Sequence, residues 1–198
     1  MRHKGIDKEE TRRKIVAAAS QGFRKHGYGG IGVDGLAKSA GVTSGAFYSH
    51  LGSKDGAFNI ALTAGLDEVI DSLPKLQKKH GAAWVEAFAE YYLSKHHRGD
   101  LESGCAMATL TPEVVRFGDE MHEIFEKKMF VIVDLIAQGL AGDSDEICHS
   151  RAWSMLGILI GGINIARGMK STKASETVAD AIKIAAINSA GKTLAVKS

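Results

Sequence analysis

The chain has 198 residues, of which 44% are hydrophobic and 24% charged, so it can form a folded core and global disorder is excluded. Pro74 and Pro112 are its only prolines, and this scarcity favours long helices and predicts an all-α fold. Residues 1–56 carry ten Lys and Arg against five acids, whereas the rest of the chain is net acidic. A polyanion partner is therefore expected at the N-terminal end, with a merely solvated basic surface as the alternative.

The first predicted helix spans residues 8–26. Apolar residues recur there at four-residue steps, at Ile15, Ala19 and Phe23, and Gly27 is expected to end the helix. Together with the two short helices that follow, this helix is assigned to an N-terminal domain over residues 1–53.

Two short helices follow over residues 33–40 and 44–50. Gly41 is expected to close the first of them, because glycine adopts the left-handed conformation at little cost, and Ser44 is the expected N-cap of the second. A pair of short helices joined by a glycine-containing turn, the second starting with small polar residues, has the layout of a DNA-reading helix-turn-helix. A plain helical hairpin is the alternative.

Residues 54–198 are assigned to a second, larger helical domain. Its first helix is expected from Lys54, capped by Ser53, towards Leu73, with Pro74 marking its end or a kink. A helix near residue 110 is expected to bend or break at Pro112. The further helices are predicted over residues 82–96, 104–116, 119–140, 145–169 and 174–190.

Membrane insertion and secretion are not expected. The strongest apolar run, residues 152–166, is shorter than the roughly 20 residues that a spanning helix needs. No signal segment opens the chain, and Cys105 and Cys148 are too few for a disulfide scaffold. The sequence therefore predicts a cytoplasmic protein.

Three separately placed motifs carry a resemblance to a known family. They are TRRKIVAAA from Thr11, FRKHGY from Phe23, and LAKSAGVTSGAFYSHL from Leu36, followed by SKD at Ser53. In order and spacing, this stretch resembles the Tet repressor family of bacterial regulators over about residues 8–62. The resemblance implies a three-helix DNA-binding domain, a helical ligand-binding and dimerisation domain, and repression of a palindromic operator that a small molecule relieves.

The resemblance also implies which residues meet double-stranded DNA. The turn and the N-terminal end of the recognition helix place Thr43, Ser44, Gly45 and Ala46 nearest the bases. Phosphate contacts are expected from Tyr48, His50 and Lys54. A packed ring is the alternative for Tyr48, and a solvated side chain for His50 and Lys54. The family often has a hydroxyl cap on the second helix, but Gly32 stands there in this chain.

Basic residues near the N-terminus are expected to add non-specific, salt-screened DNA affinity. These residues are Arg2, Lys4, Arg12 and Arg13.

Aromatic and methionine side chains of the second domain are expected to line an effector cavity. The candidates are Trp84, Phe88, Tyr91, Tyr92, Cys105, Met107, Met121, Phe125, Met155 and Leu159. The alternative is an ordinary helical core, since these side chains fill cores as readily as pockets. The effector is a small molecule that the sequence does not identify.

Cys105 stands at the expected start of a helix, where the dipole favours the thiolate, so redox sensing is a second hypothesis for it. No metal or other cofactor is expected, because the spacing of the histidines fits no zinc or di-iron site. No phosphate loop, nucleophile elbow or paired-carboxylate pattern points to an enzyme.

Small residues on the last two predicted helices suggest close helix packing. Gly157 and Gly161 lie four residues apart, and Ala181, Ala185 and Ser189 follow at the same spacing. The resemblance implies that these helices pair with their copies in a homodimer. The rival to an operator-specific regulator is a helical dimer that binds DNA without sequence preference.

Overall fold

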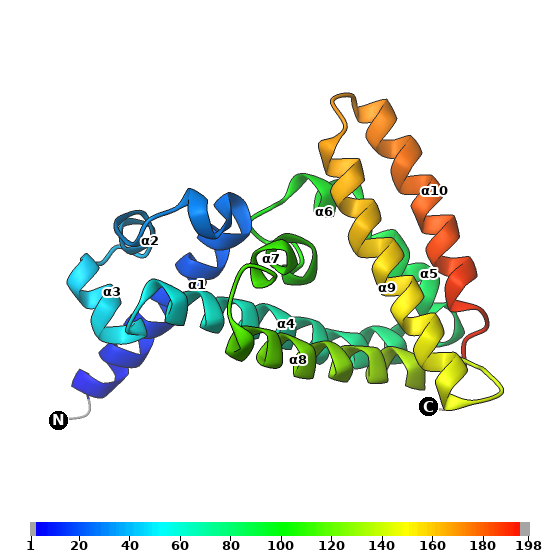
Figure 1. The fold of residues 1–198 in the computed structure, drawn as a ribbon, viewed down its shortest axis with the longest axis horizontal. Coiled ribbons are helices and arrows are strands. Elements are labelled where there is room, and N and C mark those ends of the chain that lie inside the picture. The colour runs from blue at the N-terminus through cyan, green and yellow to red at the C-terminus, as the bar shows by residue number, and fades with distance from the viewer. Residues whose placement is uncertain (1–2, 195–198) are drawn as a thin grey trace. The chain divides into compact units, whose positions relative to one another are not determined.

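The computed structural model describes residues 3–194, with side chains described from residue 8 onward, and confirms the all-α fold (Figure 1). Within these residues no β-strand forms, although Leu140 and Thr193 make an isolated antiparallel bridge. The elements are α1 (His3–Gly30), α2 (Val33–Ser39), α3 (Ser44–Leu51), α4 (Lys54–His80), a 3₁₀ turn (Gly81–Ala83), α5 (Trp84–Tyr92), α6 (Lys95–Gly99), α7 (Ala106–Val114), α8 (Asp119–Gln138), α9 (Asp145–Gly168) and α10 (Thr172–Ala190).

The chain packs as two compact units. The first unit contains the residues up to Leu66 together with Leu101–Phe125, and the second contains Asp67–Asp100 together with the residues from Glu126 onward. The packing boundary therefore differs from the domain boundary expected between residues 53 and 54. The reason is burial: the start of α4 inserts Phe58 and Leu62 into the first unit, and α7 packs on α1. The functional boundary stays a prediction.

The first unit is organised around α1. Ile15 and Phe23 are fully buried, and so are Leu36 of α2 and Phe47 of α3. Gly27 breaks α1 as expected, because its φ of 72° and ψ of 172° are not helical.

Helix α2 also begins and ends as expected. Gly32 is its N-cap and offers no side-chain bond, and Gly41, with a φ of 70°, follows its C-terminal end.

One local expectation was wrong, and at both prolines the alternative of a helix end or break was wrong. Thr43, not Ser44, caps α3, because the Thr43 hydroxyl oxygen accepts a hydrogen bond from the Ala46 N–H at 3.2 Å. Pro74 does not end α4, which continues to His80, and Pro112 lies inside α7. A proline removes a single N–H donor, and the neighbouring Leu73 is buried at 1% exposure, so tertiary packing holds the helix across it.

The helix expected over residues 82–96 was wrong as well, because it is divided into a 3₁₀ turn, α5 and α6. Leu93 ends α5, and the Ser94 hydroxyl oxygen then accepts from the His97 N–H at 3.1 Å and caps α6. A local capping bond thus replaces continuation of the helix. The cap of α4 was predicted correctly, since the Ser53 hydroxyl oxygen accepts from the Gly56 N–H at 2.9 Å.

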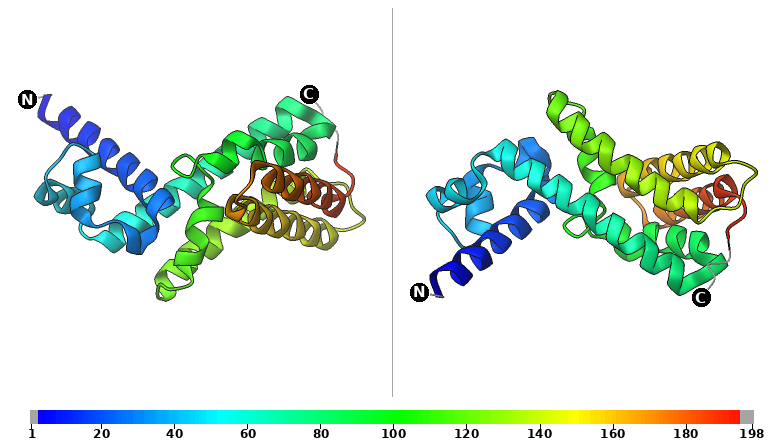
Figure 2. Two further views of the ribbon diagram at one scale, coloured as in Figure 1. Left: turned by 90° about the horizontal axis from the view of Figure 1, so that it is seen from above. Right: turned by 90° about the horizontal axis from the view of Figure 1, so that it is seen from below.

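The second unit is built on the antiparallel pair α9 and α10, which lie side by side along their length (Figures 1 and 2). Gly162 permits this approach, because a Cβ there would stand 2.2 Å from Cγ2 of Ile182. Trp84 of α5 is fully buried, and its Nε1–H donates to the Gly139 carbonyl oxygen at 3.1 Å. No helix in the described part of the chain has the length and apolar character needed to span a membrane.

Candidate nucleic-acid interface

Helices α2 and α3 form the predicted helix-turn-helix. The turn is closed by backbone bonds from the Gly41 N–H to Lys38 O (3.1 Å) and from the Val42 N–H to Ala37 O (3.0 Å). Leu36 and Phe47, both at 0% exposure, bury the contact between the helices. Helices α2 and α3 therefore form a compact pair, in which the outer face of α3 is free to meet a partner.

Side-chain bonds hold α3 at both ends. At its N-terminal end the Ser44 hydroxyl donates to the Asp34 carboxylate of α2 at 2.5 Å. At its C-terminal end the Arg12 guanidinium of α1 donates to the His50 carbonyl oxygen at 2.8 Å. Sequence reasoning missed both bonds, because their partners are 10 and 38 residues apart and no periodic pattern links them.

The residues expected to meet DNA differ in exposure. Thr43, Gly45 and Tyr48 are exposed, while Ser44 and Ala46 are half-buried. Tyr48 is 49% exposed, and its ring meets that of Phe47 at 90° with the centroids 6.0 Å apart, so its ring is not packed away between helices. The hydroxyl group is left available for an outside partner.

The phosphate-contact candidates His50 and Lys54 are both half-buried. The Lys54 ammonium lies 4.2 Å from the centroid of the Tyr28 ring, a cation–π geometry that limits where the side chain can point. The Tyr28 hydroxyl donates to the Asp55 carboxylate, and this bond, with burial second, raises the pKa of Tyr28 to about 12. Tyr28 is therefore a neutral platform under Lys54 at ordinary pH.

Tyr28 is itself held by packed aromatic rings. Its ring meets Phe58 edge-on at 5.6 Å and Phe117 edge-on at 5.0 Å, while Phe58 and Phe117 stack at 4.8 Å. Phe117 follows α7, so a segment remote in sequence helps to fix the platform under Lys54.

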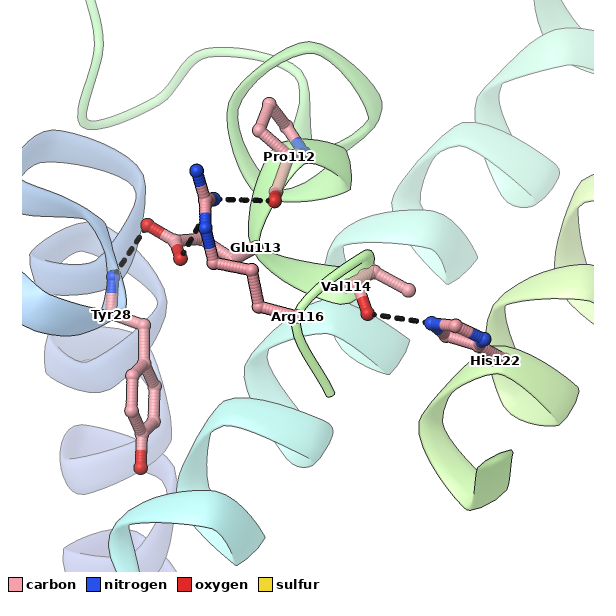
Figure 3. Close-up of polar contacts among 6 residues, drawn as sticks. All are labelled: Tyr28, Pro112, Glu113, Val114, Arg116 and His122. Atoms are coloured by element: carbon pink, nitrogen blue, oxygen red, sulfur yellow. Dashed lines mark hydrogen bonds and ion pairs between the residues drawn. The ribbon is translucent and has the colours of Figure 1, made fainter. Parts of the chain in front are cut away.

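Helix α7 also contacts the break in α1 (Figure 3). The Tyr28 N–H donates to a carboxylate oxygen of Glu113 at 3.3 Å, and Arg116 pairs with the other oxygen at 3.6 Å. Glycine is favoured at this point because its φ of 72° lies in the left-handed region, and a Cβ there would also stand 2.8 Å from the Glu113 carboxylate, which would have to shift. The bond gives the Tyr28 N–H an acceptor where the helical ladder is interrupted.

The expected effector-cavity residues are divided between the two units. Cys105, Met107, Met121 and Phe125 belong to the first, whereas Trp84, Phe88, Tyr91, Tyr92, Met155 and Leu159 belong to the second. Trp84, Tyr92, Met107, Met155 and Leu159 are fully buried at 0–1% exposure, as core side chains are. Phe88 and Tyr91 line a groove of about 300 Å³ in the second unit, and Met121 lines a hollow of about 450 Å³ in the first.

The two cysteines do not form a disulfide. Cys105 is half-buried at the N-cap of α7, and Cys148 is buried, with its Sγ–H donating to Leu140 O at 3.7 Å. Among the described side chains, no group of three or more His, Cys, Asp or Glu residues is placed to hold a metal ion.

A sequence model of the bacterial regulatory proteins of the tetR family matches residues 15–59, which span the helix-turn-helix and the start of α4. The transcriptional repressor NemR of Escherichia coli K12 is 24% identical over 143 residues, 70% of this chain and 71% of NemR.

Solved structures of the family share the fold. The reduced form of E. coli NemR aligns with a TM-score of 0.72 and 21% identity, over 88% of this chain and 96% of that one. A TetR-family regulator from Agrobacterium tumefaciens aligns with a TM-score of 0.74 and 12% identity, over 89% and 97% of the two chains. A third, from Cytophaga hutchinsonii, has a TM-score of 0.73 and 18% identity over 97% and 98%. In its helix-turn-helix, in its sequence relatives and in its fold, this chain is similar to TetR-family regulators, and these likenesses support a DNA-binding transcriptional regulator.

Proposed function

We propose that the protein is a repressor that binds a palindromic operator as a homodimer and releases it when a small-molecule effector binds. The observation that carries the proposal is α3, a short helix bonded at both ends that exposes Thr43, Gly45 and Tyr48. The family match over residues 15–59 and the likeness to a named repressor support this reading.

The proposed contacts divide by chemistry. Small residues from Thr43 to Ala46 admit the major-groove edges of bases, and Tyr48, His50 and Lys54 bind phosphates. The Ser44 hydroxyl proton is committed to Asp34, so that oxygen is left as an acceptor for a base amino group. Lys54 is pre-oriented by Tyr28, which lowers the entropic cost of a phosphate contact.

The proposed dimer uses α9 and α10. Side chains exposed there include Ile165 (52%) and Ile184 (58%), with Trp153 at 40%. Gly157 and Gly161 are also exposed, which allows another helix to approach. A two-fold dimer presents two α3 helices, so its operator is a palindrome with half-sites about 34–36 Å apart. We place the protein in the cytoplasm, where its DNA would lie.

The test is selection of bound fragments from a random DNA pool by the full chain, compared between wild type and Tyr48→Ala. We expect a palindrome that the variant binds roughly ten- to 150-fold more weakly, the equivalent of about 1.5–3 kcal/mol for a lost hydrogen bond to a charged group. Val131→Ala, which shortens a comparably exposed side chain (42%) of α8 in the second unit, is the control and should bind normally.

Two outcomes would count against the proposal. Retention of fragments without a shared sequence, with steep salt dependence, would indicate non-specific electrostatic binding. Equal binding by wild type and Tyr48→Ala would remove α3 from the interface.

A further inference from the structure

A groove of about 300 Å³ lies between α4 and α5 in the second unit. Its apolar lining includes Leu73, Leu76 and Phe88, and the Tyr91 ring stands at the edge with 59% of its surface exposed. The volume is at the lower end of the about 300–1,000 Å³ typical of small-molecule sites. The groove is therefore sized for a small, flat organic molecule.

Two lysines line the same groove. Lys75 and Lys79 are four residues apart on α4, so both project from one face of the helix. Both are exposed, and no acid among the described residues pairs with either of them. The groove thus combines an apolar floor with two lysines that make no ion pair within the described part of the chain.

The helix dipole of α4 explains only in part why lysines lie beside the groove. Cations favour the C-terminal turn of any helix, and α4 ends with Lys78, Lys79 and His80. Lys78 satisfies the dipole equally well but does not line the groove. The placement of Lys75 and Lys79 beside apolar side chains is therefore the feature that an anionic ligand would explain.

We propose that this groove binds a small aromatic carboxylate. The ring would lie against Leu76, Phe88 and the exposed face of Tyr91, where burial of apolar surface supplies affinity. The carboxylate would reach the ammonium groups of Lys75 and Lys79, which select an anion over a neutral or cationic relative. Because these lysines are exposed, each contributes a factor of about 1.4 to 5 in affinity, so charge confers selectivity more than strength.

The proposal rests on the proposed function in one respect: the aromatic carboxylate is the effector that releases operator DNA. Helix α4 carries the groove residues near its C-terminal end and Lys54 at its start, so one continuous helix contains both the ligand site and a DNA-contact candidate. Ligand binding and DNA binding are measured separately below, so that the failure of one is distinguishable from the failure of the other.

The test is calorimetric titration of the full chain, without DNA, with 2-naphthoate, neutral 2-naphthamide and cationic 2-naphthylmethylamine. We expect 2-naphthoate to bind at least threefold more tightly than the amide, the amine to bind least, and the preference to shrink as salt rises. Lys75→Ala/Lys79→Ala should reduce naphthoate affinity about three- to tenfold. Lys78→Ala is the matched control and should leave it unchanged.

Tyr91→Ala tests the apolar part of the proposed groove site. We expect it to lower the affinity for all three naphthyl ligands to a similar extent. Equal binding of naphthoate and naphthamide, or equal losses in Lys78→Ala and the double variant, would overturn the anion site. Release of operator by naphthoate from wild type but not from the double variant would support the effector role. Naphthoate binding without release, in a protein that binds operator normally, would overturn that role.

Discussion

Arg12 acts on the recognition helix from outside it. The last carbonyl groups of a helix have no partner within the helix, and the Arg12 guanidinium satisfies that of His50 at 2.8 Å. A cation at this end also complements the helix dipole. Arg12 was expected to add non-specific phosphate affinity, but this bond makes it a positioning residue for α3.

The salt dependence of operator binding separates these two roles for Arg12. We expect Arg12→Ala to weaken operator binding about three- to tenfold, because only part of the roughly 1.5–3 kcal/mol of a hydrogen bond to a charged group is transmitted to DNA binding through the position of α3, and the slope of log affinity against log salt should be unchanged. Arg13→Ala, which removes the exposed neighbour, is the control for a phosphate contact and should reduce the slope by about one. A reduced slope in Arg12→Ala would show that Arg12 binds phosphate instead.

At the scale of elements, the sequence predicted what depends on local pattern. Apolar spacing located α1 and α2, Gly27 and Gly41 located their ends, and the motif around Ser53 located the start of α4. The helix break after Leu93 was not predicted, because apolar residues continue across it and only the Ser94 cap reveals it.

The bonds that shape the candidate site could not be predicted in the same way. The Tyr28 platform under Lys54 and the bond from Ser44 to Asp34 join residues on different helices. Periodicity tells which face of a helix is buried, but not which polar side chains meet once the helices pack. The groove between α4 and α5 was missed for the same reason, although Phe88 and Tyr91 were among the effector candidates.

Helix α6 contains a histidine that should make stability depend on pH. His97 is 5% exposed, and its ring contacts those of Tyr91 and Tyr92, with centroids 5.2 and 5.0 Å away. Burial lowers the pKa of His97 below its usual 6.5, with a further contribution from the positive charge of Arg167. A backbone hydrogen bond to Tyr91 raises this pKa by a smaller amount, and the still smaller effects of His96 and Asp100 lower and raise it respectively.

The sign of the pH effect follows from linkage. The unfolded chain binds the His97 proton more readily than the folded one, so this contribution to stability is complete above pH 6.5 and is lost as pH falls through the folded-state pKa. We expect the urea midpoint of the wild type to fall between pH 7 and pH 5, and that of His97→Gln to fall less.

His149→Gln is the opposite control for this measurement. Bonds to the Asp145 carbonyl and the Asp134 carboxylate raise the pKa of His149, so its contribution is present below pH 6.5 and is lost as pH rises through the folded-state value. Removing it should steepen the acid-side loss rather than flatten it. Identical pH profiles for the wild type and His97→Gln would exclude His97 as the source.

At the scale of the whole molecule, three glycines of α9 differ in their surroundings, since one packs against a neighbouring helix of the same chain and two face open space. Gly162 is buried against Ile182, and a Cβ there would meet it at 2.2 Å. Gly157 and Gly161 lie on the exposed face of the same helix, and no heavy atom of the described chain comes within 4 Å of a Cβ built at either, apart from the helix's own backbone and the chain neighbours. Packing within the described chain therefore does not require glycine at these two positions, whereas the proposed dimer would.

Replacing Gly157 or Gly161 by leucine should have opposite effects depending on whether α9 forms a dimer interface. In an isolated chain, Gly157→Leu and Gly161→Leu should stabilise α9, because leucine favours an exposed helix by up to about 1 kcal/mol over glycine. At an interface the same side chains keep the partner helix away, so we expect full helicity by circular dichroism together with dissociation to monomers by sedimentation equilibrium. Gly162→Ala, the control for packing within the chain, should lower the melting temperature directly.

Dissociation should also change how the protein binds DNA. Two linked recognition helices make the second half-site contact intramolecular, an advantage that monomers lose. The leucine variants should therefore lose far more affinity for a palindrome than for a single half-site. Dimers that persist in both variants would show that α9 does not form the interface along this face, and the glycines would then have to be explained by another contact.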